Sequence, residues 1–236
     1  MNPTINLYNT DCLPAMQKMA DNQYDLAIVD PPYGLDIVEK SSRLGKSKDQ
    51  WKSGGRFKYY KYSNWDKNTP NDKYFNELLR ISKNQIIWGW NFFSYNFSKS
   101  KCFIVWNKIG RDDRADGELA WTSFDKPAKI FDYSRADAYI NDCDIKIHPT
   151  QKPVKLYKWL LKNYAKQGDK ILDTHFGSLS IGIACWDYDF DLDAYEIGKD
   201  YFEAGKNRLE IHMKRPKPFF KELDVQNKDS KLNKFF

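Results

Sequence analysis

The sequence has few residues that could build a metal site or a disulfide framework. Its 236 residues include four cysteines, none of them in a C-x-x-C pair, and only three histidines. Structural zinc sites combine closely spaced cysteines and histidines, so we expect no metal site and reduced cysteines. The chain also lacks an apolar run of membrane-spanning length and an N-terminal segment that resembles a secretory signal. These absences favour a cytoplasmic protein with no membrane partner.

The composition is instead that of a folded protein with a modest basic excess. Hydrophobic residues make up 41% of the chain and aromatic residues 16%, enough for a sizeable core. The 38 basic and 32 acidic residues leave a formal net charge of +6 at pH 7, which permits a polyanionic partner without demonstrating one. We expect one domain over residues 1–213, followed by a basic tail over residues 214–236.

Strand-like and helix-like segments alternate along the chain, which predicts an α/β fold with a largely parallel sheet. We expect strands at residues 5–8, 24–30, 85–88, 102–106, 128–133, 170–173 and 191–196. Apolar residues at helical spacing predict helices at residues 13–19, 71–82, 153–164, 178–185 and 199–212. Asn71 is suited to cap the second of these helices.

Asp30, Pro31, Pro32 and Tyr33 follow an apolar run at residues 26–29. A buried strand that ends in this way presents a carboxylate, carbonyl groups and an aromatic ring together. Proline fixes φ and has no backbone N–H, so the carbonyls here remain free to accept hydrogen bonds. A base amino group offers two N–H donors, and Tyr33 can cover the ring of that base. The motif therefore predicts a pocket that modifies an exocyclic amine on a base removed from its stack.

A second cluster follows the strand expected at residues 170–173. Asp173 ends this strand, and Phe176, Gly177 and Ser178 lead into a helix, an arrangement typical of nucleotide pockets. The next expected strand ends at Glu196. That is about 20 residues further on, the spacing at which an acid can accept hydrogen bonds from both ribose hydroxyls.

The third cluster has the sequence His-Pro-Thr-Gln-Lys-Pro at residues 148–153 and directly precedes an expected helix. Thr150 is placed to cap that helix, and Lys152 is placed to pair with a carboxylate at the same mouth. His148 taken alone would be a structural residue, and only the motif around it suggests a role.

In this order, the three motifs resemble those of the β-class DNA amino-methyltransferases, and the resemblance covers residues 5–210. The family transfers a methyl group from S-adenosylmethionine to adenine N6 or cytosine N4 of DNA. It implies a Rossmann-like sheet of seven strands with helices on both faces, in which the catalytic motif precedes the cofactor motif. It also implies double-stranded DNA as a partner. An acid at the first position of Asp-Pro-Pro-Tyr resembles the adenine-N6 enzymes.

Carried onto this chain, the resemblance implies two groups of site residues. The catalytic group binds the target amine and stacks on the base: Asp30, Pro31, Pro32 and Tyr33. The cofactor group surrounds S-adenosylmethionine: Asp11, Cys12, Gln151, Lys152, Asp173, Phe176, Gly177, Ser178, Glu196 and Tyr201.

A basic loop at residues 35–63 interrupts the alternation of strands and helices. It carries eight basic and three acidic residues, which gives 8 − 3 = +5. Long loops in compact domains are usually functional or disordered. We expect this loop to assist a short target-recognition segment at residues 134–147 and to contact DNA phosphates through Lys46, Lys48, Lys52, Arg56 and Lys58.

Several alternatives remain open. The family commonly has a second glycine where this chain has Leu179, and a leucine there would narrow the cofactor pocket, so one rival is a silent relative that only binds DNA. Cytosine-N4 transfer is another, whereas a cytosine-C5 mechanism is excluded because the chain has no Pro-Cys pair.

Each motif also has a purely structural interpretation: Asp30 in a strand-ending turn, Gly177 in a helix-start turn, Glu196 as a surface acid, and the basic loop as a solvated face. A homodimer and a cognate restriction enzyme stay open as partners.

Overall fold

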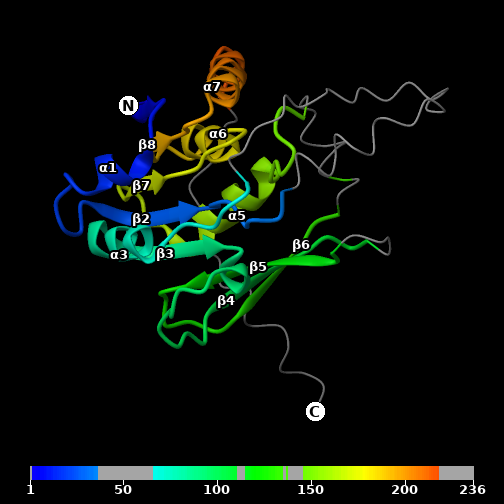
Figure 1. Ribbon diagram of the computed structural model, residues 1–236. Helices are drawn as coiled ribbons and strands as arrows, with labels where there is room; N and C mark the ends of the chain where they lie inside the picture. The colour runs from blue at the N-terminus through cyan, green and yellow to red at the C-terminus, as the bar shows by residue number, and fades with distance from the viewer. Residues whose placement is uncertain (1, 37–65, 111–114, 135–136, 138–145, 218–236) are drawn as a thin grey trace, which may run out of the picture.

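The computed structural model describes residues 2–36, 66–110, 115–134, 137 and 146–217. An eight-stranded sheet runs through them in the order β1-β8-β7-β2-β3-β5-β4-β6 (Figure 1). Strands β1, β8, β7, β2 and β3 are mutually parallel, β5 is antiparallel to both of its neighbours, and β6 pairs in parallel with β4. The strands are β1 (Ile5–Tyr8), β2 (Tyr24–Val29), β3 (Ser82–Trp88), β4 (Phe103–Asn107), β5 (Gly117–Thr122), β6 (Lys129–Asp132), β7 (Lys170–Asp173) and β8 (Asp191–Tyr195).

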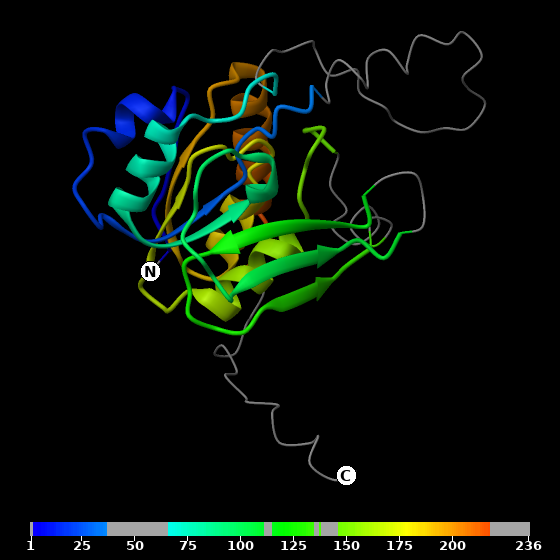
Figure 2. The same ribbon diagram turned by 60° about the horizontal axis from the view of Figure 1, so that its bottom comes forward.

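Helices cover both faces of this sheet (Figure 2). On one face lie α1 (Cys12–Met16) and α3 (Asp72–Ile81); on the other lie α5 (Val154–Tyr164) and α6 (Ser180–Asp187), with α7 (Lys199–Met213) packed on α6. A 3-10 helix, η1 (Trp90–Phe92), follows β3. The Asn71 cap is confirmed, because its side chain accepts a hydrogen bond from the N–H of Tyr74 in the first turn of α3.

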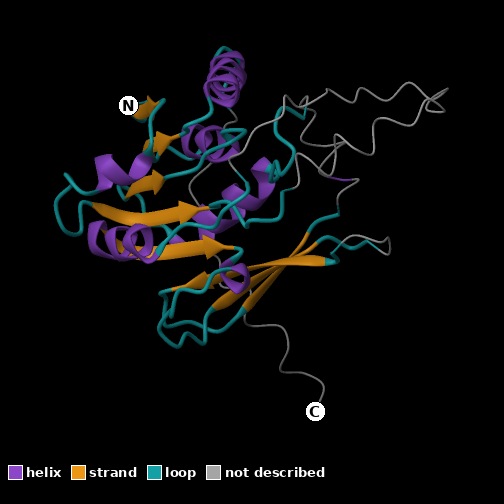
Figure 3. Cartoon of the chain, in the orientation of Figure 1, coloured by secondary structure: helices purple, strands orange, loops and turns teal. Residues whose placement is uncertain are grey.

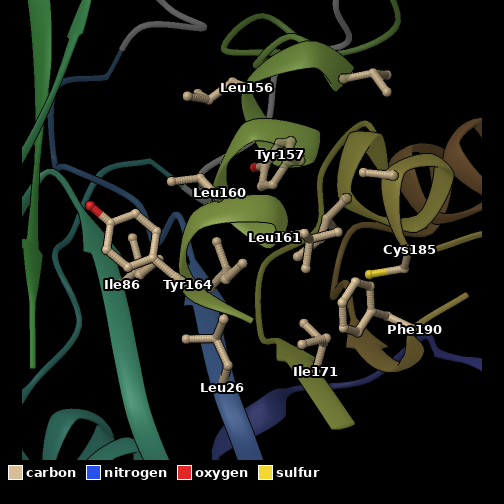
Figure 4. Close-up of a cluster of buried hydrophobic side chains, with 14 of the residues drawn as sticks. Leu26, Ile86, Leu156, Tyr157, Leu160, Leu161, Tyr164, Ile171, Cys185 and Phe190 are labelled. Carbon is tan, nitrogen blue, oxygen red and sulfur yellow. The ribbon is translucent and has the colours of Figure 1, made fainter. Parts of the chain in front are cut away.

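The central strand β2 explains why helices are needed on both faces. Its side chains alternate, so Leu26 and Ile28 enter one core while Ala27 and Val29 enter the other. The first core is filled by α5 and α6, whose apolar side chains face β2 and β7 in Figure 4. The second core is closed by α1 and α3. A strand buried on both faces requires an uninterrupted apolar run, and residues 26–29 supply it.

The parallel strands place their carboxyl ends at one edge of the sheet. From β7 the chain passes through α6 to β8, which lies next to β7 toward the β1 edge of the sheet. From β2 it passes through α3 to β3, which lies next to β2 in the opposite direction along the strand order (Figure 3). Open α/β sheets bind ligands at such a reversal, outside the carboxyl ends of the strands. Asp30 directly follows β2 and Asp173 ends β7, so the fold brings both motifs to the point of reversal.

The predicted fold class is confirmed, with one strand more than the seven expected. The additional strand is β5, which forms a ladder between β3 and β4. It was not expected because it follows β4 without a helix between the two strands, which interrupts the alternation of strands and helices. Its sequence, Gly-Glu-Leu-Ala-Trp-Thr, also lacks a regular alternation of polar and apolar residues.

Some predictions concern segments outside the described residues. These include residues 37–63 of the basic loop, with Lys46, Lys48, Lys52, Arg56 and Lys58, most of the segment at residues 134–147, and residues 218–236 of the tail. Within the described ranges, no helix combines the length and apolar character that a membrane span requires.

Candidate active site

Asp30 lies beyond the last residue of β2, in a buried network of charged groups and a hydroxyl. The Tyr33 hydroxyl donates to Asp30 Oδ1 at 2.5 Å, and Lys152 Nζ lies 2.5 Å from Asp30 Oδ2. The Lys152 side chain is only 2% exposed, so water hardly reaches this ion pair. Burial, opposed by the charge of Lys152, raises the pKa of Asp30 above its usual range. The expected pairing of Lys152 with a carboxylate is thus confirmed.

Glu118 completes this network, although no sequence motif singled it out. Glu118 Oε2 lies 2.9 Å from Lys152 Nζ, and Lys108 Nζ donates to Glu118 Oε1. Burial opposes the charged form of Glu118, but Lys152 and Lys108 lower its pKa to about 2. Burial likewise opposes the charge of Lys152, but Asp30 and Glu118 raise its pKa. Two negative and two positive charges therefore balance in a site with little solvent.

The Tyr33 ring is held by neighbours from the segment that follows β3. Gly89 has φ +68°, and a Cβ atom there would lie 2.1 Å from Tyr33 Cε1, so only glycine fits without displacing the ring. The Phe92 ring is stacked on Tyr33 with a centroid distance of 5.0 Å and an interplanar angle of 11°. Phe92 is 44% exposed, whereas Pro31 is buried and Pro32 half-buried. An accessible aromatic ring thus lies beside the residue expected to stack on the target base.

Glu196 ties together the two turns that border the second pocket. Its Oε2 accepts a hydrogen bond from the N–H of Gly177 at 3.0 Å, and its Oε1 accepts one from the N–H of Gly198 at 2.7 Å. Gly177 has φ +50°, a conformation that favours glycine. Burial raises the pKa of Glu196, against the effect of these N–H groups. A half-buried carboxylate oriented by two backbone amides is not an ordinary surface acid.

Asp173 ends the neighbouring strand β7, and its carboxylate is buried without a cationic partner. The residue is 1% exposed, and the N–H of His175 donates to Asp173 Oδ1 at 2.9 Å. No basic side chain in the described part of the chain forms an ion pair with it. Burial raises the pKa of Asp173 to about 8. A positively charged ligand near Asp173 would offset the cost of burying this carboxylate.

Asp11 and Cys12 lie at the same edge, where α1 begins. Asp11 Oδ1 accepts a hydrogen bond from the N–H of Leu13 at 3.0 Å and caps this helix. Burial, followed by the charges of Asp11, Asp173 and Glu196, raises the pKa of Cys12 to about 12. Cys12 therefore carries a protonated thiol and is not a nucleophile at neutral pH. The electrostatic effect of both strand-end acids on Cys12 places it beside the second pocket.

Phe176 and Ser178 support the turn at Gly177 from the core side. Phe176 is 4% exposed, and its ring packs against that of Phe202 at a centroid distance of 5.8 Å. The Ser178 carbonyl accepts a hydrogen bond from Arg208 Nη1 at 2.7 Å. Both residues are therefore placed to hold the shape of the turn.

His148 lies between the turn at Gly177 and the start of α7. A Cβ atom on Gly177 would lie 3.4 Å from the His148 ring, and the Tyr201 ring meets His148 edge-on at a centroid distance of 4.4 Å. Burial lowers the pKa of His148 to about 3, so its ring is neutral at physiological pH.

The rest of the third motif differs in part from the prediction. Thr150 does not cap α5, because Pro153 occupies the N-cap position and has no side-chain donor or acceptor for the helix end. The Thr150 hydroxyl instead lies 3.1 Å from His148 Nδ1. Gln151 Oε1 accepts a hydrogen bond from the N–H of Ile147 at 3.0 Å and so holds the motif in a turn.

Leu179 adopts a left-handed conformation with φ +56° at the start of α6. Its side chain is 0% exposed and belongs to the core between α6 and α7. Two glycines make room for it: a Cβ atom on Gly182 would lie 2.8 Å from Leu179 Cγ, and one on Gly205 would lie 3.2 Å from Leu179 Cβ. The leucine therefore fills a space that neighbouring residues leave open.

The two groups of site residues adjoin at the carboxyl ends of β2 and β7. These strands pair in parallel, with Leu26 opposite Ile171, so their ends lie side by side. Tyr33 and Phe176 pack against the same apolar core. Ser180 Oγ also donates to the Lys152 carbonyl at 2.8 Å, which links α6 to the third motif. The catalytic and cofactor motifs therefore lie at the same edge of the sheet.

In the part of the chain that the structure describes, no group of three or more histidine, cysteine, aspartate or glutamate side chains is arranged to hold a metal ion. The described cysteines Cys12, Cys102 and Cys185 are all free and buried. What the site offers is oriented carboxylates, an ammonium group and aromatic rings. Such groups can bind an amine and a positively charged ligand at one place.

Comparison with known proteins places this arrangement in a family. The pattern of the DNA methylase family N6_N4_Mtase matches residues 24–207. Type II methyltransferase M.HpaI from Haemophilus parainfluenzae is 23% identical over 246 residues, an alignment that covers 85% of this chain and 73% of that protein. DNA adenine methyltransferase YhdJ from Escherichia coli K12 is 31% identical over 85 residues, covering 36% of this chain and 28% of that protein.

Solved structures share the fold. The M1.HpyAVI–SAM complex superposes with a TM-score of 0.54 and 19% identity. The alignment covers 87% of this chain and 100% of that one. The cytosine-N4-specific PvuII DNA methyltransferase gives a TM-score of 0.52 and 12% identity, over 90% of this chain and 93% of that one. At these identities the likeness establishes the fold, and it does not distinguish one target base from another.

Proposed function

The chain belongs to the N6/N4 DNA methylase family, and on this premise we propose that it methylates adenine N6 of a base flipped out of double-stranded DNA, with S-adenosylmethionine as the donor. The observation that carries the proposal is that Asp30, Asp173 and Glu196 follow or end neighbouring parallel strands at one edge of the sheet. Two ligands bound there would face each other. Methyl transfer requires this, because donor and acceptor must be in line and in contact.

The second pocket suits S-adenosylmethionine by the charge of its side chains. Among the described residues, the buried carboxylate of Asp173 has no ion-pair partner, and S-adenosylmethionine carries two positively charged groups. Glu196, held rigidly by Gly177 and Gly198, suits the hydroxyls of a ribose. When bound, the cofactor supplies a methyl group on a positively charged sulfur, so no enzyme nucleophile is required.

In the first pocket, Asp30 would accept one N–H of the target amine, and the Pro31 carbonyl would accept the other. Among the described residues, no hydrogen bond occupies that carbonyl. Holding both protons turns the lone pair of the nitrogen toward the methyl group. The carboxylate also stabilises the positive charge that develops on nitrogen, an electrostatic effect that is strong in a buried site. The amine becomes acidic once it is alkylated, so the surplus proton then leaves readily.

Adenine rather than cytosine is supported by the acid at the first position of Asp-Pro-Pro-Tyr and by the partial match to the Escherichia coli adenine enzyme. Cytosine N4 is the second candidate, since the fold is shared with a cytosine-N4-specific enzyme. Mass spectrometry of nucleosides from methylated DNA distinguishes them. N6-methyl-2′-deoxyadenosine is expected, and N4-methyl-2′-deoxycytidine would assign the chain to the other base.

A silent, DNA-binding relative is the rival from another class, and Leu179 was its main support. The burial of Leu179 against Gly182 and Gly205 weakens that argument, because the side chain occupies the core. Titration with S-adenosylmethionine tests the rival directly. Absence of binding would favour it.

The basic loop remains our proposal for the DNA phosphate contacts. Neutralising Lys46, Lys48 and Lys52 together should flatten the dependence of DNA affinity on salt, because each lost phosphate contact lowers the slope of log K against log salt. An unchanged slope would place the phosphate contacts elsewhere.

The decisive test of the active site is Asp30→Ala. This variant should lose methylation while its affinity for S-adenosylmethionine stays close to that of the wild type, because Lys152, the cofactor residue that contacts Asp30, keeps Glu118 as an ion-pair partner. Asp125→Asn is a matched control, since Asp125 pairs with Lys101 in an exposed ion pair away from the site. Full activity of Asp30→Ala would refute the assigned role.

A further inference from the structure

Lys152 occupies the place at Asp30 that the proposed reaction needs for the target amine. Its Nζ lies 2.5 Å from Asp30 Oδ2, and the Tyr33 hydroxyl already donates to Asp30 Oδ1 at 2.5 Å. An ammonium and a base amino group are both N–H donors. A target amine that binds at this oxygen therefore competes with Lys152 for it.

We propose that Glu118 is a positioning residue that retains Lys152 when the target amine replaces Lys152 at Asp30. The inference rests on the proposed function, because it concerns how the amine reaches this carboxylate. No sequence motif and no role implied by the family resemblance includes Glu118. It lies on β5, the strand that sequence patterns did not predict.

The geometry around Lys152 allows this exchange with little movement. Three oxygen atoms lie close to this ammonium: Asp30 Oδ2 at 2.5 Å and Glu118 Oε2 at 2.9 Å as ion-pair partners, and the Tyr33 hydroxyl at 3.2 Å as a hydrogen-bond acceptor. If the amine takes Asp30, Lys152 still keeps a carboxylate and a hydroxyl. It also keeps the face of the Trp88 ring, 5.3 Å from Nζ to the centroid.

Glu118 is itself held in place for this role. Lys108 binds its other oxygen, so Oε2 stays directed toward Lys152. Without Glu118, the buried Lys152 would have Asp30 as its sole carboxylate partner among the described residues and would hold it more tightly. An ammonium that loses its last carboxylate in a buried site is strongly destabilised.

The same arrangement matters when charge moves onto the amine. The target nitrogen becomes positive during methyl transfer, and Lys152 is then a like charge nearby. Glu118 neutralises Lys152 and draws it away from Asp30. Replacing Glu118 by glutamine changes the net charge of the four-residue cluster from zero to +1, which opposes the developing positive charge.

The kinetic test compares Glu118→Gln with Asp125→Asn on unmethylated genomic DNA, using S-adenosylmethionine with a labelled methyl group. Glu118→Gln should lower kcat on the order of 10- to 100-fold, less than the loss of about 100- to 1000-fold from removing a direct contact. Its dissociation constant for S-adenosylmethionine should stay within about twofold of the wild type. Asp125→Asn should match the wild type in both measurements.

A double-mutant comparison separates this role from a merely structural one. In a Lys152→Met background, Glu118→Gln should change kcat by no more than about twofold, because the residue it acts through is gone. An undiminished effect in that background would overturn the inference. So would wild-type kcat in the single variant, or a loss of cofactor affinity as large as the loss of kcat.

Thermal unfolding of the protein alone provides a second measurement that needs no activity. Asp30→Asn and Glu118→Gln each leave Lys152 with one carboxylate, but the double variant leaves none. The melting temperature should therefore fall by more in the double variant than in the two single variants together, and additive losses would overturn the sharing of Lys152. If the wild type methylates no DNA while this cooperativity is seen, the proposed function fails and the shared ion pair stands.

Discussion

Leu179→Gly, which installs the glycine common in the family, should destabilise this protein and leave its affinity for S-adenosylmethionine nearly unchanged. The leucine is 0% exposed and packs against Gly182 and Gly205 between α6 and α7. Removing a buried leucine side chain costs about 3–5 kcal/mol through lost burial and the cavity left behind. Two smaller effects act at the same position and oppose each other.

The first is strain, since Leu179 has φ +56°, and a left-handed residue other than glycine costs about 1–2 kcal/mol. The second is the greater flexibility of glycine in the unfolded chain, which costs about 0.5–1 kcal/mol. The net expectation is a loss of about 3 kcal/mol in the free energy of unfolding. For a domain of this size, that lowers the melting temperature by about 6–12 °C.

Differential scanning calorimetry and cofactor titration together decide this prediction. Gly182→Ala provides the control, because its Cβ atom would lie 2.8 Å from Leu179 Cγ. It should destabilise the wild type, yet be tolerated or stabilising beside Leu179→Gly, where the space is empty. A raised melting temperature in Leu179→Gly, with cofactor binding about tenfold tighter, would show instead that the leucine obstructs the cofactor pocket.

Three further predictions concern the two groups of site residues. Glu196→Gln should weaken cofactor binding about tenfold, as measured by calorimetry. The carboxylate of Glu196 accepts hydrogen bonds from two backbone N–H groups, and a glutamine amide would present a donor to one of them. Unchanged affinity would refute the ribose contact. Gly89→Ala should lower kcat with little effect on cofactor affinity, because its Cβ atom displaces the Tyr33 ring, and wild-type kcat would contradict that geometry. Affinity for S-adenosylmethionine should rise from pH 6 to about 8 and then level off. Burial raises the pKa of Asp173 to about 8, so below that pH a cationic ligand must first displace a proton from the carboxyl group. A flat pH profile would argue against this contact.

The pH prediction has a counterpart in stability. Burial raises the pKa of Asp173 above its value of about 3.9 in the unfolded chain. The stability gained from its protonated form is therefore complete below that value and is lost as the pH rises through about 8. A saturating cationic cofactor should restore part of this loss at alkaline pH, and the melting temperature with and without cofactor measures it.

Much of the fold could be predicted from the sequence because local patterns dominate there. The seven expected strands all form, and the central ones follow apolar runs such as residues 26–29 of β2. The cap at Asn71 and the ends of α3 follow from the chemistry of a helix start. The predicted Thr150 cap was wrong because the hydroxyl has a competing partner in His148, and because Pro153 is the N-cap residue of α5 and provides no side-chain cap.

The candidate site divides in the same way. Motifs with fixed spacing identified Asp30, Lys152, Asp173 and Glu196, because each lies at the end of a strand or the start of a helix. Glu118 could not be found in this manner. A single acid on an irregular strand carries no local signal, and its importance comes from two lysines contributed by other segments.

Local patterns in the sequence are enough to predict the order of strands and helices, the apolar faces that bury them, and the residues placed at each strand end. Local propensity and hydrophobic periodicity suffice for this, because they act within a few neighbouring residues. The burial of Leu179 in the core and the sharing of Lys152 by two carboxylates emerge only when the chain is folded. Those outcomes depend on packing volume and on charge interactions in a buried, weakly screened site between residues far apart in the chain, and no local pattern encodes either.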